Sequence, residues 1–275
     1  MFFGDELLAR AEERLREICP SPEDELALLG TILATLSGNE STARLRRIAL
    51  DIDDLCSQVR WHLGQALLIL NSCPNIAKAG EQDAEYIRRA GFHAGALLLL
   101  RAYRLGADRV MYSDLSEARA GGTVGGWIFH MLIDSAIHRC VSALDRIAAI
   151  LWTAADLPPS NVYFRSKKLA RIHGVFGSTE TAELVRLAET PLFECVIAYR
   201  DRLTHTTKAY TRAAGFSPAE SWTDNEGRRV AWAPDALDAN TLFGLGNAAY
   251  HQFVDALKLC NPVLERRWPI PKELQ

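Results

Sequence analysis

The side chains best suited to chemistry lie in one short segment, Arg200-Asp201-Arg202-Leu203-Thr204-His205. A neutral imidazole can accept the proton of a ribose 2′-hydroxyl, and a guanidinium can neutralise the charge that builds on the attacked phosphate. Arg200 and His205 therefore have the chemistry needed for metal-free cleavage of RNA. Three side chains around them are supporting candidates: Tyr199, Arg202 and Thr204.

The segment belongs to a predicted helix that Pro191 opens. Apolar residues at helical spacing predict its core-facing stripe: Leu192, Val196, Tyr199 and Leu203. Arg200 lies about 80° from the first residue of this stripe, and His205 about 140° further round the axis. An arginine at the edge of a buried stripe must be paired or bind an anion, because an uncompensated buried charge costs several kcal/mol. Arg200 and His205 can meet on one phosphate only if the helix bends or ends between them, or if a second copy of the chain supplies one of them.

A second line of polar side chains is predicted on a long helix over residues 127–155. Asp134, His138 and Asp145 share one line, about 100° from the centre of the apolar face. One interpretation is a solvated face with a weak Asp134–His138 pair. The other is that this line faces the motif helix, where Asp134 and Asp145 would orient Arg200 or His205.

Residues 222–232 predict a small β-hairpin that turns at Asn225-Glu226-Gly227. Its tryptophans and arginines could stack on RNA bases, or could cap the helical bundle. The candidates for RNA contact are Lys208, Trp222, Arg228 and Arg229.

Other common enzyme sites are not indicated. No histidine has an acidic residue three positions before it, and there is no H-x-x-x-H, G-x-S-x-G or Walker sequence. The six cysteines form no C-x-x-C and suggest neither a zinc site nor a disulfide framework. The glycine-rich stretch 121–126 lacks the strand-to-helix context of a phosphate loop and is expected to be a hinge. We therefore expect no metal, no cofactor and reduced thiols.

Composition sets the class of protein. The chain has 275 residues, 48% of them hydrophobic and 24% charged, which is typical of a globular protein. A net charge of -3 excludes a globally basic nucleic-acid binder, so any RNA contact must be a local patch. No apolar run reaches the roughly 18 residues of a membrane span. We expect a cytoplasmic protein with no membrane contact.

Helical periodicity dominates the whole chain and predicts an all-α protein. Helices are expected over residues 5–18, 23–36, 42–71, 82–106, 127–155, 165–173, 178–187 and 238–260, besides the motif helix. Pro262 and Pro269 are expected to end the fold. The glycine stretch then divides an N-terminal helical region, residues 1–120, from a second helical domain, residues 121–275.

From Trp127 to Cys260, the sequence resembles the HEPN superfamily (higher eukaryotes and prokaryotes nucleotide-binding). The resemblance is carried by Arg200-x4-His205 with the polar Asp201 directly after the arginine, and by the order of a long helix, short helices, motif helix and closing helix. It implies Asp201 as a third catalytic residue and the motif at a homodimer interface. It also implies an RNA-cleaving toxin or antiviral effector, with an antitoxin protein as a candidate partner.

The motif spacing occurs a second time, from Arg88 to His93, but there arginine rather than a small polar residue follows the first arginine.

Two interpretations of the function remain open from the sequence. The alternative to an enzyme is a catalytically inactive HEPN-like protein or another helical interaction module. In that case Arg200 and Asp201 form a structural ion pair, and His205 is a surface residue.

Overall fold

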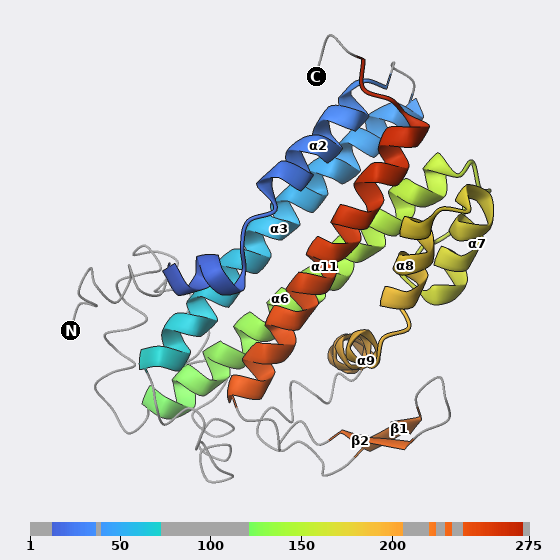
Figure 1. Ribbon diagram of the computed structural model, residues 1–275. Coiled ribbons are helices and arrows are strands. Elements are labelled where there is room, and N and C mark those ends of the chain that lie inside the picture. Colours follow the sequence, from blue (N-terminus) through green and yellow to red (C-terminus); the bar gives the residue numbers. More distant parts are fainter. Residues whose placement is uncertain are drawn as a thin grey trace. The chain divides into compact units, whose positions relative to one another are not determined.

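The structure is a computed structural model of the 275-residue chain. It describes residues 13–36, 40–72, 121–205, 220–223, 229–232 and 239–271, although the side chains of some residues in these ranges lie outside the description. The described elements are helices and one short hairpin, which confirms the all-α class (Figure 1). Within these ranges, no helix combines the length and apolar character needed to span a membrane.

Residues 13–18 are helical, and the named elements follow in chain order. They are α2 (Glu23–Ala34), α3 (Glu40–Ser72), α6 (Gly121–Ala154), α7 (Ser166–Phe176), α8 (Thr179–Leu187), α9 (Pro191–His205), β1 (Glu220–Thr223), β2 (Arg229–Trp232) and α11 (Ala239–Arg267).

The chain divides into two compact units. The first unit contains residues 1–18, 61–135 and 199–246, and the second unit contains residues 19–60, 136–198 and 247–275. The helices α3, α6, α9 and α11 each contribute to both units. The predicted boundary at residue 120 stays a prediction, because the preceding residues 73–120 lie outside the description.

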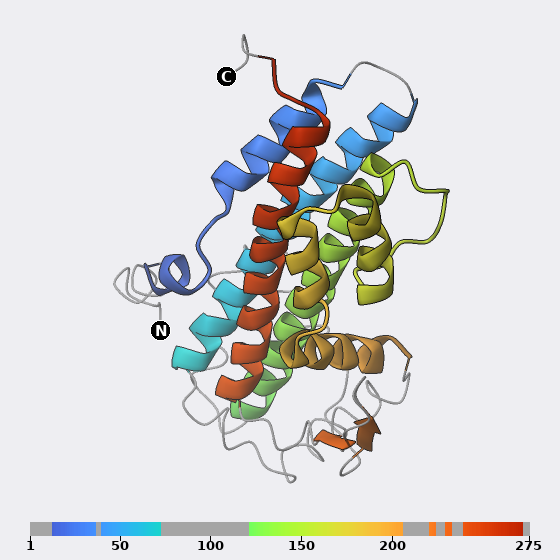
Figure 2. The ribbon, with the colours of Figure 1, turned by 45° about the vertical axis from the view of Figure 1, so that its right-hand side comes forward.

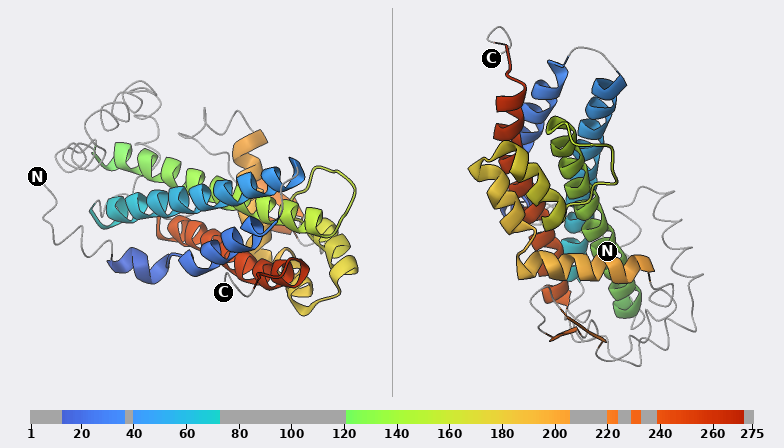
Figure 3. Two further views of the ribbon diagram at one scale, coloured as in Figure 1. Left: turned by 90° about the horizontal axis from the view of Figure 1, so that it is seen from above. Right: turned by 90° about the vertical axis from the view of Figure 1, so that its right-hand side faces the viewer.

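In the second unit, α3 and α6 run antiparallel, as Figure 3 shows from two sides. Two polar pairs fix their register: Arg139 donates to Gln58, and Arg146 lies 3.5 Å from Asp51. The apolar face predicted for the helix over residues 127–155 is confirmed in α6. Its buried residues, which extend into the first unit, include Ile133, Ile137, Cys140, Leu144, Ile147 and Leu151.

Polar contacts to backbone carbonyls hold the start of the second unit in place. The Tyr250 hydroxyl on α11 donates to the Pro20 carbonyl at 2.6 Å and lies 3.9 Å from the Cys56 sulfur. Further along α11, the Asn261 amide donates to the Glu25 carbonyl at 2.8 Å. The contact further along α11, at Asn261, is also the one further along the chain at Glu25. The chain segment that leads into α2 therefore runs parallel to α11.

The short helices α7 and α8 pack against each other (Figure 2). Gly177 ends α7 in the left-handed conformation, with φ at 61°, which glycine adopts without the steric penalty of a side chain. Ser178 then caps α8 by accepting a hydrogen bond from the Thr181 amide at 3.3 Å. The predicted pair of short helices is thus confirmed, with α7 three residues longer at its end than expected.

In the first unit, α3, α6 and α11 approach closely around Gly246. A Cβ atom at this position would lie 3.1 Å from Leu63 and 3.4 Å from Ile133, so the glycine permits the packing. The hairpin is also present, with Glu220 opposite Trp232 and Thr223 opposite Arg229.

Three local predictions are wrong. The stretch expected as a hinge is helical from Gly121, and α11 passes through Pro262 to Arg267. Val263 and Leu264 are buried after the proline, and their packing offsets the backbone hydrogen bond that Pro262 cannot make. The third error concerns α9 and is described with the site. The helix expected over residues 82–106 lies outside the described residues.

Replacing Tyr250 with phenylalanine tests the contact that holds the start of the second unit. Tyr250→Phe removes the donor to the Pro20 carbonyl and should lower the free energy of unfolding by about 1 kcal/mol. Tyr163→Phe is the matched control, because the Tyr163 side chain is 50% exposed, and it should leave the stability unchanged. Urea denaturation measures both, and equal stabilities of the two variants would contradict the assignment.

Candidate functional site

A hydrogen bond joins the motif helix to α6 in the first unit. The Tyr199 hydroxyl on α9 donates to the Asp134 carboxylate on α6. Burial raises the pKa of Asp134 from 3.8 to about 7, although the hydrogen bond from Tyr199 acts in the opposite direction. The carboxyl therefore ionises at a higher pH than an ordinary aspartate, and it holds α9 at the residue directly before Arg200.

The buried face of α9 differs from the predicted stripe. Leu192 is 43% exposed, while Phe193, Val196 and Tyr199 are buried. Arg200 follows Phe193 by seven residues and so lies within about 20° of it round the helix axis. Arg200 therefore lies at the edge of the buried face, beside Phe193; its side chain is half-buried and its Nε atom is buried.

His205 is the last residue of α9. The helix is continuous from Arg200 to this position, so the two Cα atoms diverge by about 140° round the axis. The side chains of residues 201–205 lie outside the described residues, so the roles of Asp201, Arg202, Thr204 and His205 stay predictions.

The other acidic residue predicted to face the motif has a different contact. Asp145 accepts a hydrogen bond from the Phe164 amide at 2.7 Å and so holds the loop that leads into α7. It belongs to the second unit, whereas Asp134 and Arg200 belong to the first. His138 on the same line is exposed. The structure thus brings Asp134 and Tyr199 together, and the described contacts of Asp145 are with the loop.

The candidates for RNA contact lie in or beside the hairpin. Trp222 is part of β1 and Arg229 is part of β2, where Trp222 pairs with Val230 and Arg229 with Thr223. Their side chains, and the whole of Lys208 and Arg228, lie outside the described residues. Their contact with RNA stays a prediction.

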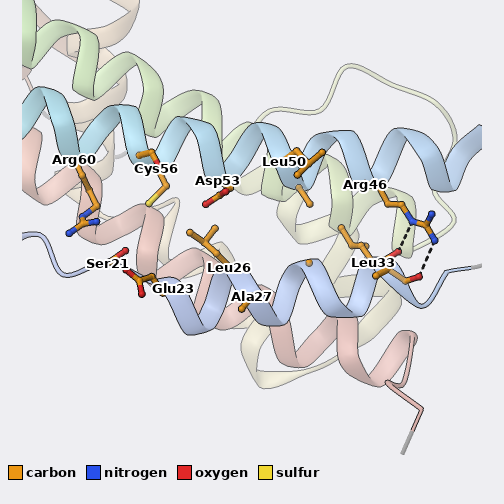
Figure 4. A pocket seen from close by; sticks show the side chains of 14 residues that line it. Ser21, Glu23, Leu26, Ala27, Leu33, Arg46, Leu50, Asp53, Cys56 and Arg60 are labelled. Carbon is orange, nitrogen blue, oxygen red and sulfur yellow. Dashed lines mark hydrogen bonds between the residues drawn. The ribbon is translucent and has the colours of Figure 1, made fainter. Parts of the chain in front are cut away.

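A groove between α2 and α3 in the second unit was not predicted (Figure 4). Its volume is about 660 Å³, and its walls include Leu26 and Leu50, the latter 70% exposed. Arg46 and Arg60 lie at opposite ends, and Arg46 donates to the carbonyls at the end of α2. The hydrophobic periodicity of each helix could not predict the groove, because the groove depends on the spacing between the two helices.

The cysteine side chains in the described residues are free. Burial raises the pKa of the Cys56 thiol to about 11 and of the Cys19 thiol to about 12. Such thiols stay protonated and are poor nucleophiles, which fits a packing role. In the part of the chain that the structure describes, no group of three His, Cys, Asp or Glu residues could hold a metal ion.

No family model matches the chain, and comparisons with curated proteins and with solved structures find no significant similarity.

The raised pKa of Asp134 predicts a dependence of stability on pH. Because the folded protein binds this proton more tightly than the unfolded chain, the contribution of Asp134 to the free energy of unfolding should fall as the pH rises from about 4 to 7. Asp134→Asn keeps an acceptor for Tyr199 but cannot ionise. Relative to the wild type, the free energy of unfolding of Asp134→Asn should therefore rise by about 4 kcal/mol between about pH 4 and 8.

Glu180→Gln is the control for this measurement. Arg266 lowers the pKa of Glu180 to about 2, so this carboxylate is ionised in the folded protein throughout the range. Its pKa in the unfolded chain is 4.5, so its replacement should shift stability by a constant amount above about pH 6. Urea denaturation at several pH values measures both variants. A pH-independent difference for Asp134→Asn would show that Asp134 does not carry the titration.

Proposed function

We propose that the chain is a metal-independent endoribonuclease of the HEPN type, with Arg200 and His205 as its catalytic pair. The position of Arg200 carries this proposal. It lies half-buried at the edge of the buried face of α9, with a buried Nε atom, and directly follows the tyrosine that donates a hydrogen bond to Asp134. A guanidinium placed by packing, rather than free on a surface, is suited to stabilising one defined phosphate.

The reaction follows from the two side chains. Neutral His205 accepts the proton of a ribose 2′-hydroxyl, and the resulting oxygen attacks the adjacent phosphorus. The bond from phosphorus to the 5′-oxygen breaks, and this oxygen takes up a proton as it leaves. Arg200 stabilises the charge on the phosphate oxygens during the attack. The products are a 2′,3′-cyclic phosphate and a 5′-hydroxyl.

In this proposal Asp134 and Tyr199 are positioning residues. Their hydrogen bond fixes the rotation of α9 on α6 and thereby the direction from which Arg200 leaves the helix. Asp201 provides the polar group next to the arginine. Asp134 thus acts through Tyr199 and the helix backbone rather than by touching the RNA.

The divergence of about 140° between Arg200 and His205 supports a site shared by two copies. A symmetric homodimer would form two equivalent clefts, each with Arg200 from one chain and His205 from the other. A toxin or antiviral effector of this kind acts on cellular RNA, and an antitoxin protein would keep it inactive.

The groove between α2 and α3 favours a second candidate function, a helical interaction module without catalysis. Its apolar walls and exposed Leu50 could receive a partner segment. In this case Arg200 serves packing alone, and the protein binds a partner without cleaving RNA.

Cleavage of RNA in the presence of a chelator tests the proposed function. Purified wild-type protein should cleave total RNA in EDTA and leave 2′,3′-cyclic phosphate ends, because neither Arg200 nor His205 needs a metal. Arg200→Ala and His205→Ala should each lower the cleavage rate by about 100-fold or more.

Arg186→Ala is the matched control, because Arg186 is exposed on α8 and paired with Glu183. It should cleave RNA at the wild-type rate. Full activity of Arg200→Ala, or activity that is lost in EDTA and restored by magnesium, would place the chemistry elsewhere. No cleavage by the wild type would favour the interaction module.

A mixed dimer tests the shared site. In a heterodimer of Arg200→Ala and His205→Ala chains, one cleft collects both defects and the other is intact, so about half of the wild-type activity should return. The two chains are co-expressed with different tags, purified as the heterodimer and assayed with RNA. An inactive heterodimer, or a monomer by size-exclusion chromatography, would reject the shared site.

A further inference from the structure

A basic segment surrounds α7 in a chain whose net charge is -3. Residues 157–179 contain no aspartate or glutamate but carry Arg165, Lys167, Lys168 and Arg171. Lys167 and Arg171 are exposed, and the structure pairs neither of them, nor Lys168, with a carboxylate among the described residues.

Three carboxylates on neighbouring elements of the second unit are paired with arginines. Glu180 accepts both guanidinium nitrogens of Arg266, at 2.9 and 2.7 Å, and Asp156 lies 2.6 Å from Arg267. Glu183 pairs with Arg186 on the same helix. Each of these three carboxylates is balanced by an arginine, whereas α7 contains Lys167, Lys168 and Arg171 and no acidic residue and so carries a net positive charge.

Trp152 holds two of the cations in place. The Lys168 ammonium lies 4.8 Å and the Arg171 guanidinium 5.2 Å from the centre of its ring. The Trp152 Nε1–H donates to the Pro158 carbonyl at 2.8 Å, so the ring itself is anchored. The negative face of the indole offsets part of the repulsion between the two cations and positions them together.

An exposed aromatic ring precedes these cations. Tyr163 is three residues before α7 and is 50% exposed, while the adjacent Phe164 is buried against Phe193. A positive surface with an accessible aromatic ring is the combination by which proteins hold single-stranded nucleic acid, through phosphate contacts and base stacking. An acidic peptide would use the charges but would leave the ring without a role.

We propose that Tyr163, Lys167, Lys168 and Arg171 form an RNA-binding surface that holds the phosphate backbone of a single strand, with Tyr163 stacked on a base. The choice of RNA rests on the proposed function, which it deepens by assigning a substrate-binding surface away from the motif residues. We call these four residues the α7 surface.

Binding of a short single-stranded 2′-O-methyl RNA tests the α7 surface. This probe has no free 2′-hydroxyl, so binding is measured without cleavage. The variant Lys167→Gln, Lys168→Gln, Arg171→Gln should make the slope of log affinity against log salt shallower by about 2. Between about 50 and about 200 mM salt, wild-type affinity should therefore fall roughly 16-fold more than that of the variant.

The matched control removes the same charge from exposed arginines on other helices. Arg44→Gln, Arg47→Gln, Arg146→Gln should keep the wild-type slope, because these arginines belong to α3 and α6 rather than to the α7 surface. Tyr163→Ala should weaken binding without changing the slope, since stacking involves no charge. Circular dichroism confirms that each variant is folded.

The two proposals fail in different ways. Cleavage of unmodified RNA by the wild type, with equal affinity and slope for the α7 variant, would overturn the α7 surface and leave the ribonuclease intact. Loss of probe binding in the α7 variant, with no cleavage by the wild type, would support the surface and reject the ribonuclease. Binding of polyglutamate or phosphatidylserine vesicles in place of RNA would overturn the surface as proposed.

Discussion

A half-buried carboxyl group on α6 governs the position of the motif helix. Asp134 follows the fully buried Ile133 on α6, where an ionised carboxylate is costly. The Tyr199 hydroxyl supplies its hydrogen bond, and this contact fixes α9 in one rotation. A shift of α9 by one residue would place Ala198 or Arg200 opposite Asp134. In both cases Asp134 would lose the hydrogen bond from the neutral Tyr199 hydroxyl. The location of Arg200 therefore depends on satisfying Asp134, which ties the candidate chemistry to the packing of the helices.

The helices were predictable where burial repeats at 3.6 residues. The stripe from Ile133 to Leu151 is buried throughout, because one face of α6 packs along its whole length. The errors fall where local propensity and burial disagree. Glycine at 121 and proline at 262 are poor helix formers, but packing of the rest of each helix overrides them. On α9, Leu192 and Phe193 are both apolar, and only the neighbouring helices decide which is buried.

The candidate site was predictable in its residue types and less so in its contacts. Placing Asp134 and Asp145 on one helical line was correct geometry, but it could not show that α9 reaches the first and the α7 loop reaches the second. Contacts between residues far apart in the chain leave no periodic trace in either helix. The groove between α2 and α3 was missed for the same reason, since neither helix alone contains it.

Net charge is a poor guide to what the surface can bind. At physiological ionic strength, exposed charges more than about 8 Å apart are largely screened, so a phosphate responds to nearby side chains rather than to the whole chain. In the second unit, Glu180 and Asp156 are matched by arginines of α11, and those charges cancel locally. The cations of α7 instead share the Trp152 ring, which steadies them without neutralising them. A chain with a net charge of -3 thereby keeps a positive surface whose charge is available to a ligand.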